Sequence, residues 1–300
     1  MKTAAVVVAA AGLAAAQGRP SNESICDYYT TALLKTNNAT TQETLLTLVV
    51  NTAVIGNYTM PNVGIAVPGI LAKGTVNGTD VNLLPYFSGM LASTNGGGSK
   101  GISVNFLDGG AATPLMKNMP ADDTTSAQYT LLTHLYSYFG GLLGCSQFGK
   151  DYSGSTNMYE VHKFMDLSAA EVAYFIEQVG LSAASFGVAK EDYTAVGMAL
   201  NDAFGYRCSE PASIPASAKA EPQSICTDDT CPLAAKNDCS IYATVSKPMA
   251  VNSTMSASGT MAPTASASST SVPVQNAASG LESTFAAGVA GLLGAAAWFL

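Results

Sequence analysis

The chain has 300 residues, a formal net charge of −8 and only two arginines. An acidic chain with so few arginines cannot present the basic patch by which proteins hold phosphate backbones, so nucleic acid is excluded as a partner. About two hundred residues lie between its low-complexity ends, which is enough for one domain with a sizeable core.

The first residues have the pattern of a secretory signal peptide. Lys2 precedes an apolar run from Ala4, and small residues follow at Ala14, Ala15 and Ala16. This order is typical of a cleaved leader, so we predict a signal peptide over residues 1–16 and a mature chain from Gln17. The protein is therefore expected outside the cell.

The cysteines are even in number, which in a secreted chain predicts disulfides. Six cysteines allow 15 pairings, so the connectivity stays open. A zinc site at Cys226 and Cys231 is disfavoured, because no histidine lies nearby and the oxidising route favours bridges. The six are Cys26, Cys145, Cys208, Cys226, Cys231 and Cys239.

Apolar residues at helical spacing predict two early helices, over residues 24–34 and 41–55. The segment from Gly56 to Asp123 is rich in glycine and proline and predicts a long insertion. A loop of this length is uncommon in a compact domain. It is a functional flap, a glycosylated surface excursion or an element that the pattern does not reveal.

A buried helix is predicted from Ser126 onward. Leu131, His134, Leu135 and Tyr138 recur there at steps of three and four residues. The glycine pair at 140 and 141 weakens or ends this helix.

Asn157 is expected to cap a short helix on which Met158, His162 and Met165 share one face. Ser168 and Glu171 then form a capping box that opens another helix, which ends near Gly187. A final helix is predicted from Lys190 or Asp192 to Cys208. The expected fold class is all-α, and the domain spans residues 17–244.

The two histidines, His134 and His162, carry the chemistry that we predict. A neutral imidazole on an apolar helix is a good ligand for haem iron, although a lone histidine there is more often a satisfied core residue. His162 is the predicted iron ligand of haem b, and His134 is the distal group or a second ligand. The predicted pocket also contains Leu131, Tyr138, Met158, Met165 and Phe175, with Lys163 reaching a haem propionate.

The order of motifs over residues 126–206 resembles the truncated haemoglobins, particularly their first group. In that family a distal helix ends in a glycine turn, a loop carries Tyr-x-Gly, and a Met-x-x-(Ala/Val)-His-Lys run supplies the proximal histidine. The counterparts here are Gly144 and Cys145, Tyr152 and Gly154, Met158 with Val161, His162 and Lys163, and then Gly187 and Val188.

This resemblance implies a globin-like helical core in which His162 is the proximal ligand and His134 lies on the distal helix. It also implies that Tyr28 or Tyr29 begins the family's first long helix, whose tyrosine often donates to bound gas.

The C-terminal end predicts attachment to the cell surface. Residues 245–276 are rich in serine and threonine, a composition that suits a disordered, O-glycosylated stalk. Residues 277–300 join small residues, a spacer and an apolar tail, as in a GPI-attachment signal. The predicted partner is thus the outer leaflet of the plasma membrane. Sequons for N-glycosylation occur at Asn22, Asn38, Asn57, Asn77 and Asn252.

Together these patterns predict a GPI-anchored, extracellular haem protein that binds or redox-processes oxygen, nitric oxide or a peroxide. The alternative is a non-catalytic cell-wall or adhesion glycoprotein without a cofactor. A third possibility is haem capture for iron uptake, which requires an exposed and exchangeable haem.

Overall fold

The computed structural model describes residues 18–243, except 61, 96–99, 151, 215 and 217. The predicted signal peptide, Ser/Thr-rich stalk and GPI-attachment segment lie outside the described residues.

The longer helices begin and end close to where the sequence predicts them. The predicted N-caps are confirmed: the side chain of Asn157 accepts from the backbone N–H of Glu160, and Ser168 and Glu171 form a capping box. The helices that the sequence predicted are α1 (Ile25–Leu34), α2 (Ala39–Ile55), α5 (Ala127–Leu142), α6 (Met158–His162), α7 (Ala169–Ser185) and α8 (Lys190–Phe204).

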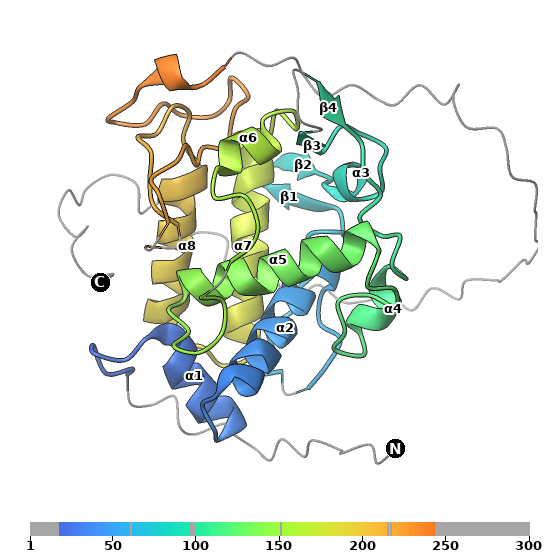
Figure 1. Cartoon of the computed structure of the whole chain (residues 1–300), viewed down its shortest axis with the longest axis vertical. Coiled ribbons are helices and arrows are strands. Elements are labelled where there is room, and N and C mark those ends of the chain that lie inside the picture. Colours follow the sequence, from blue (N-terminus) through green and yellow to red (C-terminus); the bar gives the residue numbers. More distant parts are fainter. Residues whose placement is uncertain are drawn as a thin grey trace, which may run out of the picture. The chain divides into compact units, whose positions relative to one another are not determined.

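Helix α2 lies at the centre of the described fold. It packs against α1, α5 and α7, and α5 crosses it (Figure 1). Because neighbours surround it, α2 buries polar as well as apolar side chains, among them Gln42 and Asn51. Asn51 is completely buried, and its Nδ2 donates to the carbonyl oxygen of Leu115 at 3.1 Å. Burial of these amides is tolerated because each has hydrogen-bond partners.

The all-α, globin-like prediction is wrong, because the described residues form helices together with two small antiparallel sheets. One pairs β1 (Gly74–Val76) with β2 (Thr79–Val81), and the other pairs β3 (Thr94–Asn95) with β4 (Gly101–Ile102). Strands of two or three residues are too short to show the alternation by which a strand is recognised. The turn between β1 and β2 is Asn77-Gly78, a dipeptide that favours hairpins and that the prediction overlooked.

The glycine-rich segment from Gly56 to Asp123 therefore contains structure that the pattern did not reveal. Besides the two hairpins it forms the short helices α3 (Leu84–Phe87) and α4 (Ala112–Leu115). Its start is fixed to the end of α2, since the N–H of Ile70 donates to the carbonyl of Ala53 at 2.9 Å. The segment is thus part of the folded domain.

Gly69 is where this segment makes its closest approach to α2. Its φ is +85°, and a Cβ at this position would lie 2.7 Å from both the Ile55 carbonyl carbon and the Val54 carbonyl oxygen. Its N–H donates to the buried Gln178 Oε1 at 2.9 Å, which joins the segment to α7. Only glycine fits a site that combines left-handed backbone with contact to backbone atoms.

We expect Gly69→Ala to lower the free energy of unfolding by about 3–5 kcal/mol, through left-handed strain and overpacking together. The control is Gly78→Ala in the first hairpin, where φ is +79° but no atom lies within 4 Å of the added Cβ. That variant should lose only about 1 kcal/mol, the cost of the backbone conformation. Urea unfolding of both variants measures the difference, and equal losses would contradict the packing argument.

The six cysteines form three disulfides, Cys26–Cys145, Cys208–Cys239 and Cys226–Cys231. The predicted bridges are confirmed, and Cys226 and Cys231 pair with each other. The first disulfide joins α1 to the turn after α5, while the other two hold the segment after α8. Three disulfides fit a secreted protein. Within residues 18–243 no helix combines the length and the apolar character needed to cross a bilayer.

Candidate functional site

His162 is the last residue of the short helix α6, and its ring is hydrogen-bonded to the backbone of the same helix. Its Nδ1 lies 2.8 Å from the carbonyl oxygen of Met158, so Nδ1 carries the proton and Nε2 the lone pair. Burial of the ring lowers the pKa of His162 below its ordinary value, against the effect of this hydrogen bond. The imidazole is therefore neutral near pH 7.

His134 lies on α5 in a different setting. Its Nε2 is 3.5 Å from Ser153 Oγ, and its ring meets the ring of Tyr152 edge-on at 6.0 Å between centroids. Tyr138, one turn later on α5, also contacts Tyr152, at 5.7 Å. The Tyr138 hydroxyl is buried and has no hydrogen-bond partner among the residues that the structure describes.

The other residues predicted for a haem pocket are engaged elsewhere. The Tyr29 hydroxyl donates to Asp192 Oδ2 at 2.8 Å and accepts from the N–H of Ala189, and the ring of Tyr28 packs edge-on against Tyr29. Lys163 Nζ lies 2.8 Å from a Glu160 carboxylate oxygen. Met158, Met165, Leu131 and Phe175 belong to the main apolar core or pack against it.

The apolar cavity of the described core differs from a haem pocket in size and in lining. The apolar cavity of the described core has a volume of about 60 Å³ and lies among α1, α2, α5, α7 and α8. Tyr29 and Phe175 line it, but neither histidine does. Pockets that bind small molecules and cofactors have volumes of about 300–1,000 Å³. In the described part of the chain, no three His, Cys, Asp or Glu side chains gather as a metal site.

The lowered pKa of His162 makes stability depend on pH. The unfolded chain binds a proton near its ordinary pKa of 6.5, whereas the folded chain resists protonation to a lower pH. The unfolding free energy is therefore expected to fall as the pH drops below 6.5, with a slope of up to about 1.4 kcal/mol per pH unit. In His162→Gln this slope should disappear, and in His134→Gln it should survive. Urea unfolding at several pH values tests this, and an unchanged slope in His162→Gln would count against it.

A second hollow, which the sequence did not suggest, lies where α5 crosses α2. This polar groove has a volume of about 290 Å³. Its walls are two matched stripes at helical spacing. Helix α2 contributes Thr40, Glu43 and Thr44, and helix α5 contributes Tyr129, Thr133 and Tyr136.

Tyr136 is the most deeply buried residue that lines the polar groove on the α5 side. Tyr136 is 2 % exposed, and its hydroxyl donates to Asn51 Oδ1 at 2.6 Å. Burial foremost, and then the nearby Tyr58 and Glu43, raises the pKa of Tyr136, so this hydroxyl keeps its proton. Asn118, which also lines the groove, accepts at its Oδ1 from the Tyr58 hydroxyl at 2.8 Å. Hydrogen bonds thus hold Tyr136 and Asn118, two residues that line the groove.

The polar groove could not be predicted from sequence, because the stripe on α2 and the stripe on α5 are about 90 residues apart in the chain. Each stripe alone is an ordinary polar face of an amphipathic helix. The one sequence signal is the repetition of threonine at three- and four-residue steps along α2, and of tyrosine and threonine at the same steps along α5.

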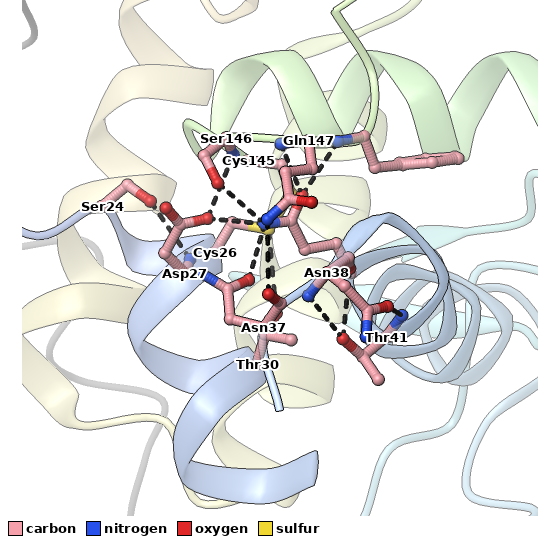
Figure 2. Close-up of a disulfide and its surroundings, with 12 residues drawn as sticks. Ser24, Cys26, Asp27, Thr30, Asn37, Asn38, Thr41, Cys145, Ser146 and Gln147 are labelled. Atoms are coloured by element: carbon pink, nitrogen blue, oxygen red, sulfur yellow. Dashed lines mark hydrogen bonds between the residues drawn. A yellow bond between two sulfur atoms is a disulfide. The ribbon is translucent and has the colours of Figure 1, made fainter. Parts of the chain in front are cut away.

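The first disulfide lies in a dense polar junction near one end of α2. Around Cys26 and Cys145, the side chains of Asp27, Asn37 and Ser146 converge (Figure 2). Gln42, which is completely buried, connects them, because its Nε2 donates to Asp27 Oδ1 at 2.7 Å and to Asn37 Oδ1 at 2.6 Å. This junction holds α1, α2 and the turn after α5 together.

Comparison of the chain with protein-family models, with curated proteins and with solved structures gave no match. The likeness to truncated haemoglobins therefore rests on the motif over residues 126–206 alone, and haem binding stays a prediction.

Proposed function

We propose that this chain is an extracellular surface glycoprotein that acts without a bound cofactor. The observation that carries the proposal is the placement of the sequons. All four sequon asparagines in the described residues, Asn22, Asn38, Asn57 and Asn77, are exposed. In Asn38 and Asn57 the side-chain oxygen accepts a backbone N–H, from Thr41 and Val67 respectively. These contacts use the side-chain oxygen and not the side-chain nitrogen, which is the atom that carries an N-glycan.

The proposal includes the C-terminal segments predicted from sequence. Residues 245–276 act as a glycosylated spacer, and residues 277–300 direct attachment of a GPI lipid. The folded domain, with its three disulfides, then projects from the outer leaflet into an oxidising medium.

Two enzymatic treatments of cells that make the full chain test this proposal. Phosphatidylinositol-specific phospholipase is expected to release the protein, and peptide N-glycosidase is expected to lower its mass and leave aspartate at the sequon positions. A matched control is the chain truncated after residue 276, which should be secreted without phospholipase. Retention after phospholipase treatment, or unmodified asparagine at all the exposed sequons, would overturn the proposal.

A haem protein is the rival function, and one observation favours it. Because Nδ1 of His162 donates to Met158, its Nε2 has the lone pair that a metal needs. The position of the apolar cavity away from both histidines argues against it. Haem titration of the purified protein separates the two. The surface-glycoprotein proposal expects no Soret band, whereas a low-spin spectrum that is lost in His134→Ala would establish bis-histidine ligation.

A further inference from the structure

The polar groove between α2 and α5 carries an inference that goes beyond the proposed function. We propose that it binds a neutral, hydroxyl-rich ligand, a saccharide, with Tyr129 stacking on one sugar face and Glu43 accepting from sugar hydroxyls.

Two threonines of the groove present acceptor atoms. The Thr44 hydroxyl donates to the carbonyl of Thr40, and the Thr133 hydroxyl donates to the carbonyl of Tyr129, each at 2.8 Å. Their hydrogens are therefore used within each helix, and the lone pairs of their oxygens remain for a ligand. A ligand that supplies many hydroxyl donors complements this surface.

Glu43 adds the strongest acceptor. It is exposed on α2, and no ion pair joins it to a lysine or arginine within the described residues. A carboxylate has two oxygens and can accept from two neighbouring hydroxyls of one sugar ring. Hydrogen bonds to a charged group are stronger than those between neutral groups.

Tyr129 supplies the apolar contact. It lines the groove in the first turn of α5 and is half-buried. A tyrosine ring offers a large flat surface at little cost in conformational entropy. The C–H face of a pyranose ring matches such a surface, while the rim hydroxyls of the sugar turn toward the threonines and Glu43.

Other ligand classes fit the groove less well. Of the described residues that line it, none is Leu, Ile, Val or Met, so an apolar helix or acyl chain finds no such side chain to pack on. None is a lysine or arginine, so a phosphate finds no counter-charge. The volume of about 290 Å³ lies at the lower end of small-molecule sites, which suits one sugar ring of a longer chain.

The test is titration calorimetry of the full chain, freed of its own N-glycans, with oligosaccharides of glucose, mannose and N-acetylglucosamine. Saturable binding of at least one is expected. Tyr129→Ala should weaken it about tenfold, the scale of one lost aromatic contact. Glu43→Gln should weaken it about fivefold, since a neutral acceptor replaces a charged one.

Matched controls are Tyr206→Ala, a half-buried tyrosine outside the groove, and Glu210→Gln, an exposed carboxylate elsewhere. Both should leave the affinity unchanged. The Glu43 change lies on the surface, so it tests the groove even if Tyr129→Ala impairs folding. Binding of none of the three sugars, or binding that both groove variants retain, would overturn the proposal.

Discussion

Replacing Gln42 with alanine is expected to lower the free energy of unfolding by about 3–5 kcal/mol, because a completely buried side chain is lost and several groups lose their hydrogen bonds to it at once. Gln42 Oε1 accepts from the backbone N–H groups of Gln147 and Phe148, each at 2.9 Å. Its Nε2 donates to Asp27 and Asn37. The Gln42 side chain is 0 % exposed, so these hydrogen bonds are made by a group that has no contact with water.

The matched control is Gln147→Ala, which removes the same side chain from an exposed position in the same junction. Its Nε2 makes one contact, with the Asn37 carbonyl at 3.3 Å, and its backbone N–H is kept. The loss should stay within about 0.5 kcal/mol, as for most surface changes. Urea unfolding monitored by circular dichroism gives both values. A loss below about 1 kcal/mol in Gln42→Ala would mean that the turn after α5 is not held by this amide.

Removing the first disulfide by Cys26→Ala with Cys145→Ala is expected to cost about 4–5 kcal/mol. The two cysteines are 119 residues apart, so the bridge closes a loop through about half of the described domain. A closed loop of this size restricts the unfolded chain strongly, and the entropic model scales that restriction with the logarithm of loop length. The slope of unfolding free energy against urea should also rise, because the freed chain exposes more surface.

The control uses the short bridge, with Cys226→Ala and Cys231→Ala. Its cysteines are 5 residues apart and equally buried, at 0 % and 2 % exposed against 0 % and 7 % for the first pair. The change in packing is thus similar, and the stability expected to be lost through loop entropy falls to about 2 kcal/mol. Urea unfolding of the two double variants compares them directly. If the short bridge proves as important as the long one, loop entropy is not the reason that the first disulfide stabilises this fold.

The helices could be read from sequence because their signals are local. Asn157, Ser168 and Glu171 cap helices where the pattern predicted, and the apolar spacing of α7 places Val172, Ile176 and Val179 in the core. Caps and helical periodicity act over four residues or fewer, so no distant part of the chain is needed to recognise them. The helix predicted at α6 was too long, because α6 ends at His162 and Met165 lies beyond it.

The hairpins and the polar groove could not be read in this way. A strand of two or three residues is stabilised by its partner and by what it packs on, and neither is visible in the strand itself. The polar groove needs the crossing of α2 and α5, which no pattern within either helix specifies. Pairing of the cysteines was equally open, since 15 arrangements satisfy the same sequence.

The sequence by itself determined where the long helices begin and that the cysteines pair, since each follows from neighbouring residues or from the composition of the chain. Only the tertiary structure decided that His162 and His134 lie apart from the apolar cavity and that Thr44 and Glu43 face Tyr129 across a groove. Those relations join residues far apart in the chain, and they are fixed by the packing of one helix on another, which depends on all of the core side chains together.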